Sequence, residues 1–163
     1  MQFRNALTNE ADLLTQLTID SKRYWKYPEE WIAIWTDDLT LSPEYIEKNM
    51  VVVAEQEEEV LGYISLIEHD KNHVVKIEES IISGGFFLDN LFIRPTHIRK
   101  GIGEKLVAIA FDWCRERQIK QLYVYSDPYS RGFYEKTGAE YVGEVKSDNI
   151  SGRTLPFLTY HIS

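Results

Sequence analysis

The chain has 163 residues, 44% of them hydrophobic and 27% charged, which suits one globular domain and argues against disorder or a collagen-like chain. The net charge of −8 argues against a nucleic-acid or anionic-membrane partner, so any anion site must be local. No apolar run approaches the roughly 20 residues of a membrane helix. A single cysteine, Cys114, excludes an intramolecular disulfide, and the N-terminus lacks the pattern of a signal peptide. Together these features predict a cytoplasmic protein.

The first part of the chain predicts one strand, three helices and a hairpin. Leu13, Leu14 and Leu17 recur at helical spacing after Thr8 or Asn9, either of which can cap that helix. An acidic run at 55–59 separates two apolar runs and is typical of a hairpin loop. In chain order we expect a strand at 2–7, helices from about 9 to 24, from about 28 and at 43–49, and strands at 51–54 and 60–68.

The segment 69–85 predicts only a hairpin-like insertion. Asp70-Lys71-Asn72 is a candidate turn, and the apolar residues from Val74 to Ile82 suit either an added strand or a short helix. Both readings stay open at this point.

The second part of the chain predicts a parallel strand–helix–strand unit followed by antiparallel strands. Arg94-Pro95 ends a strand at 86–93, and Gly101-Ile102-Gly103 opens a helix. The expected fold class is α/β or α+β with a mixed sheet. We expect the helix to bury Ile102, Leu106, Ile109 or Ala110, and Trp113, with later strands at 122–125, 141–145 and 155–161, and a short helix at 130–137 that Gly138 closes.

The segment from Arg94 to Lys105 carries four cations and one anion in an otherwise acidic chain. Gly101 and Gly103 would let an anion approach the amides of a first helical turn, where the unpaired N–H groups and the helix dipole favour it. A glycine-containing loop with a solvated basic edge is the alternative. The loop is not a dinucleotide fingerprint, because Leu106 replaces the third glycine, and it is not a Walker loop.

Two segments, LDNLFIRPTHIRKGIGEKL and DPYSRGFYEKTGAEYVGE, carry a family resemblance. In order and separation they resemble the acetyl-CoA motif and the downstream F-Y-E-K-x-G-F motif of the Gcn5-related N-acetyltransferase (GNAT) family. The resemblance implies one domain over 1–163, with a mostly antiparallel sheet, flanking helices and a parallel cofactor-binding unit. It also implies acetyl-CoA (coenzyme A) as the cofactor and an N-acetyltransferase activity.

Carried over by position, the resemblance implies a cofactor site in three parts. The amides of a loop would hold the pyrophosphate, a strand backbone would pair with the pantetheine arm, and a second motif would add further contacts. Ile98, Asp127, Ser130 and Ala139 depart from the family's usual Gln or Arg, Asn, Ala and Phe. The implied cofactor residues are Arg99, Lys100, Gly101, Ile102, Gly103 and Glu104 in the loop, Leu91, Phe92 and Ile93 in the strand, and Asp127, Ser130 and Phe133 beyond.

The same resemblance places Tyr134 near the thioester sulfur, where a phenol can protonate the departing thiolate. The alternative is a tyrosine that packs on the sheet. Asp89 shares a strand face with Leu91 and Ile93 and is our candidate base; it could equally hydrogen-bond to neighbouring strands. Glu68 and His69 are further candidates. No spacing of Cys, His and Asp suggests a metal site.

Aromatic residues in the first helices are candidates for acceptor binding. Tyr24, Trp25 and Trp31, with Tyr27 and Trp35, could cage an ammonium, or could pack on the sheet. The expected acceptor is a primary amine of a small molecule or peptide, and a homodimer is compatible with the sequence. The rival functions are a non-catalytic acyl-CoA-binding or sensing domain and a protein-interaction module.

Overall fold

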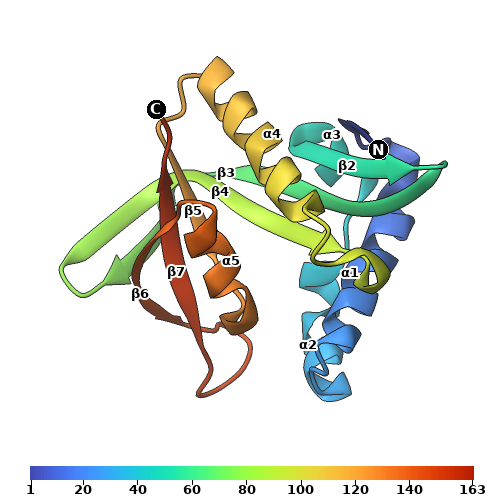
Figure 1. Ribbon diagram of the computed structural model, residues 1–163. Coiled ribbons are helices and arrows are strands. Elements are labelled where there is room, and N and C mark those ends of the chain that lie inside the picture. The colour runs from blue at the N-terminus through green and yellow to red at the C-terminus, as the bar shows by residue number, and fades with distance from the viewer. The chain divides into compact units, whose positions relative to one another are not determined.

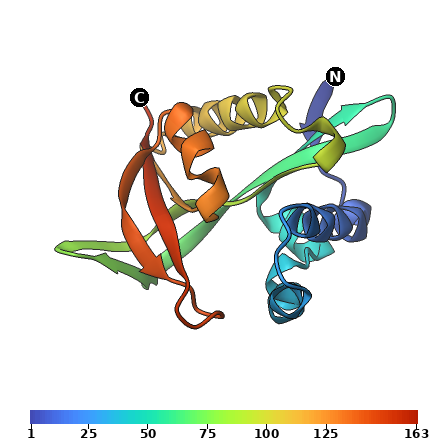
Figure 2. The same cartoon turned by 60° about the horizontal axis from the view of Figure 1, so that its bottom comes forward.

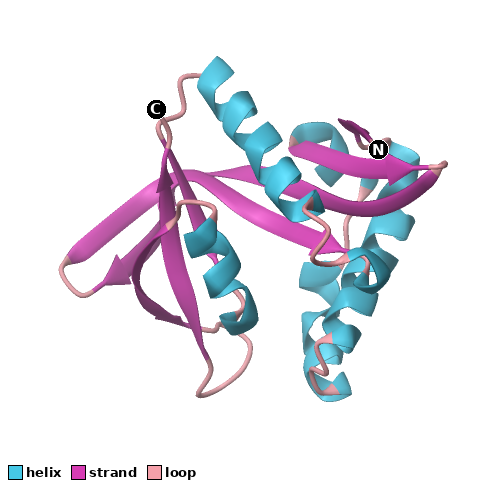
Figure 3. Ribbon diagram, in the orientation of Figure 1, coloured by secondary structure: helices cyan, strands magenta, loops and turns pink.

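Two long strands, β3 (Glu59–Ile77) and β4 (Ser80–Ile93), organise the computed structural model, which describes residues 1–163. The seven strands hydrogen-bond in the order β1-β2-β3-β4-β5-β7-β6 (Figure 1). The β4–β5 pair is parallel, whereas β1–β2, β5–β7 and β6–β7 are antiparallel. The mixed, mostly antiparallel sheet with helices confirms the predicted fold class (Figure 3). The other elements are β1 (Gln2–Asn5), α1 (Ala11–Tyr24), α2 (Glu29–Leu39), α3 (Pro43–Lys48), β2 (Met50–Gln56), α4 (Ile102–Glu116), β5 (Gln121–Tyr125), α5 (Arg131–Lys136), β6 (Glu140–Lys146) and β7 (Thr154–His161).

The chain divides into two compact units, each described here by itself. Unit 1 comprises Met1–Ser65 and Asn90–Ala108, and unit 2 comprises Leu66–Asp89 and Ile109–Ser163. The strands β3 and β4 and the helix α4 each continue from one unit into the other. The prediction of one domain over 1–163 stays a prediction.

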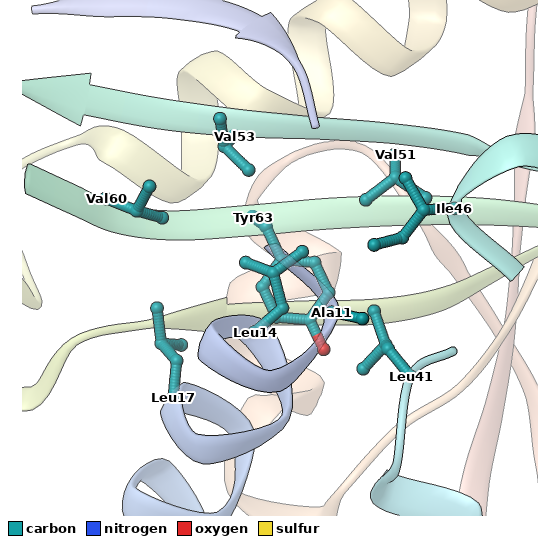
Figure 4. Close-up of a cluster of buried hydrophobic side chains, with 9 residues drawn as sticks. All are labelled: Ala11, Leu14, Leu17, Leu41, Ile46, Val51, Val53, Val60 and Tyr63. Atoms are coloured by element: carbon teal, nitrogen blue, oxygen red, sulfur yellow. The ribbon is translucent and has the colours of Figure 1, made fainter. Parts of the chain in front are cut away.

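The core of unit 1 forms where α1 packs on β2 and β3. Leu14 and Leu17 lie on one face of α1, fully buried, and point toward Tyr63 of β3 (Figure 4). Burying a leucine or tyrosine side chain contributes about 1.5–3 kcal/mol. The spacing of the α1 leucines therefore predicts its buried face correctly, apart from Leu13, which is exposed.

The predicted cap of α1 is wrong. Thr8 and Asn9 lie in a short 3₁₀ turn, Thr8–Glu10, and neither side chain caps the helix. The Glu10 carboxylate instead accepts the Leu7 N–H at 2.8 Å and pairs with Arg4 at 2.8 Å. This ion pair joins the start of α1 to strand β1, a tertiary contact that local capping preferences do not indicate.

The insertion at 69–85 is a hairpin, as expected, but its turn is elsewhere. Both strands continue to a turn at Glu78, whose φ is 54°, and Glu79 (Figure 2). Asp70-Lys71-Asn72 lies within β3. The reason is burial: Val75 and Ile77, two residues apart on β3, both pack in one core cluster with Phe87, which requires that the strand continue past Asn72.

The buried face of α4 includes Cys114, whereas the sequence predicted Trp113 on that face. Cys114 is fully buried, and this burial raises the pKa of its thiol to about 11. Trp113 is half-buried, with the guanidinium of Arg117 4.0 Å from its ring centre. The buried stripe of α4 therefore runs through Ile102, Leu106, Ala110 and Cys114.

Candidate functional site

The end of β4 is held firmly on its β3 side. A Cβ at Gly62 would lie 2.7 Å from the Cδ1 atom of Ile93 and 2.8 Å from the carbonyl oxygen of Phe92, so only glycine permits this approach. The Arg94 N–H donates to Leu61 O at 2.7 Å, which continues the pairing past the strand end. The side of Phe92 and Ile93 toward β3 is therefore closely packed.

The parallel pairing of β4 with β5 is short. Its register covers Phe86, Phe87 and Leu88 of β4 and ends at the Leu88–Val124 pair. The strand β4 nevertheless continues to Ile93. Beyond Leu88, its backbone is therefore outside this register.

A tight turn connects β4 to α4. Arg99 and Gly101 both have left-handed backbone conformations, with φ of 62° and 81°. A Cβ at Gly101 would meet nothing within 4 Å, so its approach is open. Arg99 and Lys100 are exposed, and α4 begins at Ile102. The N–H groups of a first helical turn have no partner within their helix, and with two cations beside them they favour an anion.

Tyr134 lies on α5 in unit 2, with only 6% of its surface exposed. Its ring contacts Phe133 and Tyr160 edge-on, at centroid distances of 5.5 and 6.5 Å. Burial, with Tyr160 and Asp127 nearby, raises the pKa of its phenol far above the usual value. Tyr134 therefore stays protonated at any physiological pH.

Asp127 forms an ion pair with Arg153 that the sequence did not predict. Its carboxylate lies 3.1 Å from the guanidinium of Arg153, and both groups are largely buried. Its backbone carbonyl accepts the Ser130 N–H at 2.9 Å, which starts the turn before α5. Asp127, Ser130, Phe133 and Tyr134 are therefore brought together in unit 2.

Asp89 is exposed on β4 and shares the strand face of Phe87. On that face lie two histidines of β3, His69 and His73, whose rings stack 3.9 Å apart at an angle of 9°. Both rings meet the edge or face of Phe87, and His73 Nε2 lies 2.9 Å from the hydroxyl of Tyr125 on β5. The candidate base thus has titratable neighbours.

The aromatic residues of the first helices hold a cation of the chain itself. The ammonium of Lys22, a buried residue, lies 5.2, 5.0 and 5.5 Å from the ring centres of Tyr27, Trp35 and Phe92. Trp31 packs against Tyr27 and Trp35. Tyr24 and Trp25 form an edge-to-face pair that is 47% and 39% exposed. These two remain the accessible members of the predicted acceptor set.

The model of the acetyltransferase (GNAT) family matches residues 13–139, most of the chain. The chain belongs to the GNAT acetyltransferase family. No match was found among curated proteins.

Solved structures of GNAT proteins share the fold over almost their whole length. A GCN5-related N-acetyltransferase from Rhodopseudomonas palustris has a TM-score of 0.74 at 17% identity and covers 98% of this chain and 94% of its own. The PaiA N-acetyltransferase of Thermoplasma acidophilum, solved with coenzyme A, has a TM-score of 0.71 at 17% identity and covers 98% of each chain. An aminoglycoside 6′-acetyltransferase type Ii has a TM-score of 0.66 at 21% identity, over 100% of this chain and 98% of its own. At these identities the likeness is one of fold.

The predicted GNAT site residues divide between the units. Unit 1 holds Leu91, Phe92 and Ile93 with the turn and helix start at 99–104, and it also holds Tyr24, Trp25 and Trp31. Unit 2 holds Asp89, Asp127, Ser130, Phe133 and Tyr134. Sequence reasoning missed Lys22, His73, Tyr125 and Arg153, and only the spacing of His69 and His73 offered a signal.

Neither a metal site nor a membrane-spanning helix is found in the structure. The structure contains no group of three or more His, Cys, Asp and Glu side chains that could hold a metal ion. None of its helices combines the length and the apolar character needed to cross a bilayer.

Proposed function

We propose that this GNAT protein is an acetyl-CoA-dependent N-acetyltransferase that acylates a primary amine of a small molecule or peptide by direct attack in a ternary complex. The observation that carries the proposal is the turn at 99–104. Two left-handed residues, Arg99 and Gly101, precede the first N–H groups of α4, and Gly101 leaves the approach open. Coenzyme A carries a pyrophosphate, and this turn suits that group.

Acetyl-CoA supplies, when bound, an acyl group activated as a thioester. The N–H groups of Ile102, Gly103 and Glu104 would donate to the pyrophosphate, and the Arg99 and Lys100 side chains would add positive charge. The backbone of Leu91 and Ile93, beyond the last β4–β5 pair, would bond to the pantetheine arm as to another strand. PaiA, which shares this fold, was solved with coenzyme A, and this supports the assignment.

The chemistry of transfer divides among three groups of this chain. An N–H of the segment 91–93 would polarise the acyl carbonyl. The phenol of Tyr134, which keeps its proton because burial raises its pKa, would be the group that gives a proton to the departing thiolate. The acceptor ammonium must lose a proton before it attacks, and the sequence offers Asp89, Glu68 and His69 as candidates for the base. Asp127, already paired with Arg153, would contact the cofactor as part of that pair.

Calorimetric titration with acetyl-CoA, followed by thiol release across amines, amino acids and lysine peptides, tests the proposal. Micromolar binding with acceptor-dependent release is expected. Gly103→Glu should abolish binding, because it adds a side chain and a negative charge at the turn. Ala108→Glu, at an exposed position on the same helix, is the matched control and should bind normally. Binding without release would favour a sensing domain, and no binding by the parent protein would overturn the proposal.

A further inference from the structure

We infer that His69 is the general base for the acceptor amine, that His73 and Tyr125 are its positioning residues, and that Asp89 supports it electrostatically. The inference rests on the proposed acetyl transfer and names the group that removes the proton from the acceptor. Its basis is the cluster of His69, His73, Phe87 and Tyr125 in unit 2, which we call the histidine cluster.

The stacked pair requires a local distortion of β3. Residues four apart on a regular strand are separated by about 13 Å along its axis. The His69 and His73 rings nevertheless stack 3.9 Å apart, so the chain departs from a regular strand between them. The Asp70 carboxylate accepts the Asn72 N–H at 2.8 Å at this point. The fold therefore brings together two imidazoles that a regular strand would hold apart.

The rest of the cluster fixes this stack in place. His73 Nε2 lies 2.9 Å from the hydroxyl of Tyr125, and the edge contacts of both histidines with Phe87 have centroid distances of 4.9 and 5.2 Å. Phe87 is itself buried and stacks on Tyr125 at 5.5 Å. Because a phenol both donates and accepts, the bond to His73 survives either protonation state of that ring. Burial raises the pKa of Tyr125 to about 12, so this phenol stays neutral.

The cluster lies at the end of the parallel β4–β5 register. The last pair is Leu88–Val124; Tyr125 follows Val124, and Phe87 and Asp89 flank Leu88 on the opposite face. This is the point beyond which β4 would bond to the pantetheine arm. Asp89, whose charge acts on the pKa of His69, therefore precedes along β4 the segment that is proposed to bond to the arm.

The surroundings of His69 favour the neutral form of its imidazole, which is the form that can accept a proton. Partial burial and His73 lower the pKa of His69, while Asp89 on β4 and Asp70 on β3 oppose that change. Positive charges on the two stacked rings would repel each other, which is why His73 lowers the pKa of His69. Imidazole is also a better match than a carboxylate for taking a proton near neutral pH.

The proton balance of the step is complete. His69 takes one proton from the acceptor ammonium and becomes imidazolium. The neutral amine nitrogen forms the C–N bond to the acyl carbon, and the C–S bond breaks with its electron pair on sulfur. Tyr134 gives its proton to that sulfur and regains one from the attacking nitrogen. His69 then releases its proton to solvent, and the products are the amide and coenzyme A thiol.

The first experiment compares His69→Gln with His161→Gln across pH. His161 is an exposed histidine at the end of β7, so its replacement is the matched control. We expect His69→Gln to lower kcat/KM for the amine about 10²-fold near pH 7, with acetyl-CoA affinity within twofold of the parent. In the parent protein, kcat/KM should become independent of pH above the pKa of His69. In His69→Gln it should instead rise tenfold per pH unit up to the pKa of the acceptor amine.

The second experiment uses imidazole rescue and two neighbours. Added imidazole should restore the rate of His69→Ala at least fivefold and leave that of His161→Ala unchanged. Tyr125→Phe should lower kcat about three- to tenfold and move the acid limb of the pH profile. Asp89→Asn should move that limb to lower pH, because a charge that favours imidazolium is removed.

The outcomes separate this inference from the proposed function. No thiol release by the parent protein with any amine would overturn both. If the parent protein turns over and the kcat/KM of His69→Gln lies within twofold of that of His161→Gln, only the assignment of His69 is overturned. A 10²-fold loss of plateau rate in Asp89→Asn, with the limb unmoved, would assign the base to Asp89 instead.

Discussion

The two units use polar side chains in different ways. In unit 1 they form directional hydrogen bonds inside the core: Thr18 and Tyr63 hydroxyls lie 2.6 Å apart, and Ser65 bonds to Tyr45 at 2.9 Å and to Asn90 at 3.0 Å. Such bonds fix one geometry, because a buried group that loses its partner costs about 1–3 kcal/mol. Since Asn90 lies on β4 just before Leu91, this network holds the strand that would carry the cofactor arm.

Unit 2 surrounds His69, His73 and Tyr134 with aromatic rings, as unit 1 does for Lys22. His69 and His73 stack on each other and contact Phe87 edge-on, and Tyr134 contacts Phe133 and Tyr160 edge-on. Ring contacts exclude water without consuming the donor and acceptor atoms, and burial lowers the pKa of His69 and raises that of Tyr134. The contrast is between hydrogen-bonded support of β4 in unit 1 and aromatic enclosure of titratable groups in unit 2, where we propose that proton transfer takes place.

The largest expected effect lies in unit 2. Tyr134→Phe should lower kcat at least 10²-fold and leave acetyl-CoA affinity within twofold, because only the transition state uses the proton. Tyr160→Phe is the control: it removes a 2.6 Å hydrogen bond to Thr137 and should cost stability but little turnover. Steady-state kinetics with calorimetry checks both. An unchanged kcat in Tyr134→Phe would remove this phenol from the mechanism.

The next effect concerns the support of β4 in unit 1. Gly62→Ala should lower the free energy of unfolding by about 2–3 kcal/mol, because the new Cβ collides with a backbone oxygen that cannot move aside. Gly132→Ala, where a Cβ meets nothing within 4 Å, should be neutral or stabilising by up to about 1 kcal/mol. Urea unfolding measures both. Equal stabilities of the two variants would contradict the close packing at Phe92.

A smaller loss should follow from breaking the buried hydroxyl pair of unit 1. Thr18→Val keeps the shape of the side chain but removes the partner of the Tyr63 hydroxyl, at a cost of about 1–2 kcal/mol. Thr36→Val, an exposed threonine on α2, should change stability by less than about 0.5 kcal/mol. Thermal and urea unfolding of the pair test this, and kcat should stay unchanged in both.

The smallest effect is the pH dependence of the Arg4–Glu10 pair in unit 1. Arg4 lowers the pKa of the Glu10 carboxyl, so the pair stabilises the fold above the ordinary glutamate pKa of about 4.3. That stability is lost as pH falls through the lowered value. Glu10→Gln should cost about 1 kcal/mol at pH 6, and the difference from the parent should shrink toward pH 3. A difference that stays constant with pH would contradict the ion pair.

Much of the fold could be predicted because its signals are local. The helical spacing of Leu14 and Leu17, the Arg94-Pro95 stop and the glycines of the turn before α4 all act within a few residues. The hairpin at 69–85 was placed correctly, but its turn was not. Asp70-Lys71-Asn72 has turn composition, and the strand continues past it because Val75 and Ile77 are buried against Phe87 and Phe157.

The candidate site was predictable only as far as its two motifs reach. The turn at 99–104 and the segment around Tyr134 carry the family pattern, which the family match over 13–139 confirms for the chain as a whole. The partners of those groups come from distant segments. Arg153 pairs with Asp127 across 26 positions, and Tyr125 meets His73 across 52.

By itself, therefore, the sequence determined the family, the order of its elements and the local turn conformation that suits a pyrophosphate. The tertiary structure decided that Lys22 lies among the rings of Tyr27, Trp35 and Phe92, and that two histidines of one strand stack. The physical reason is that backbone geometry is set by neighbours in the chain. Burial, ring stacking and charge pairing are set by neighbours in space, which strand pairing brings together.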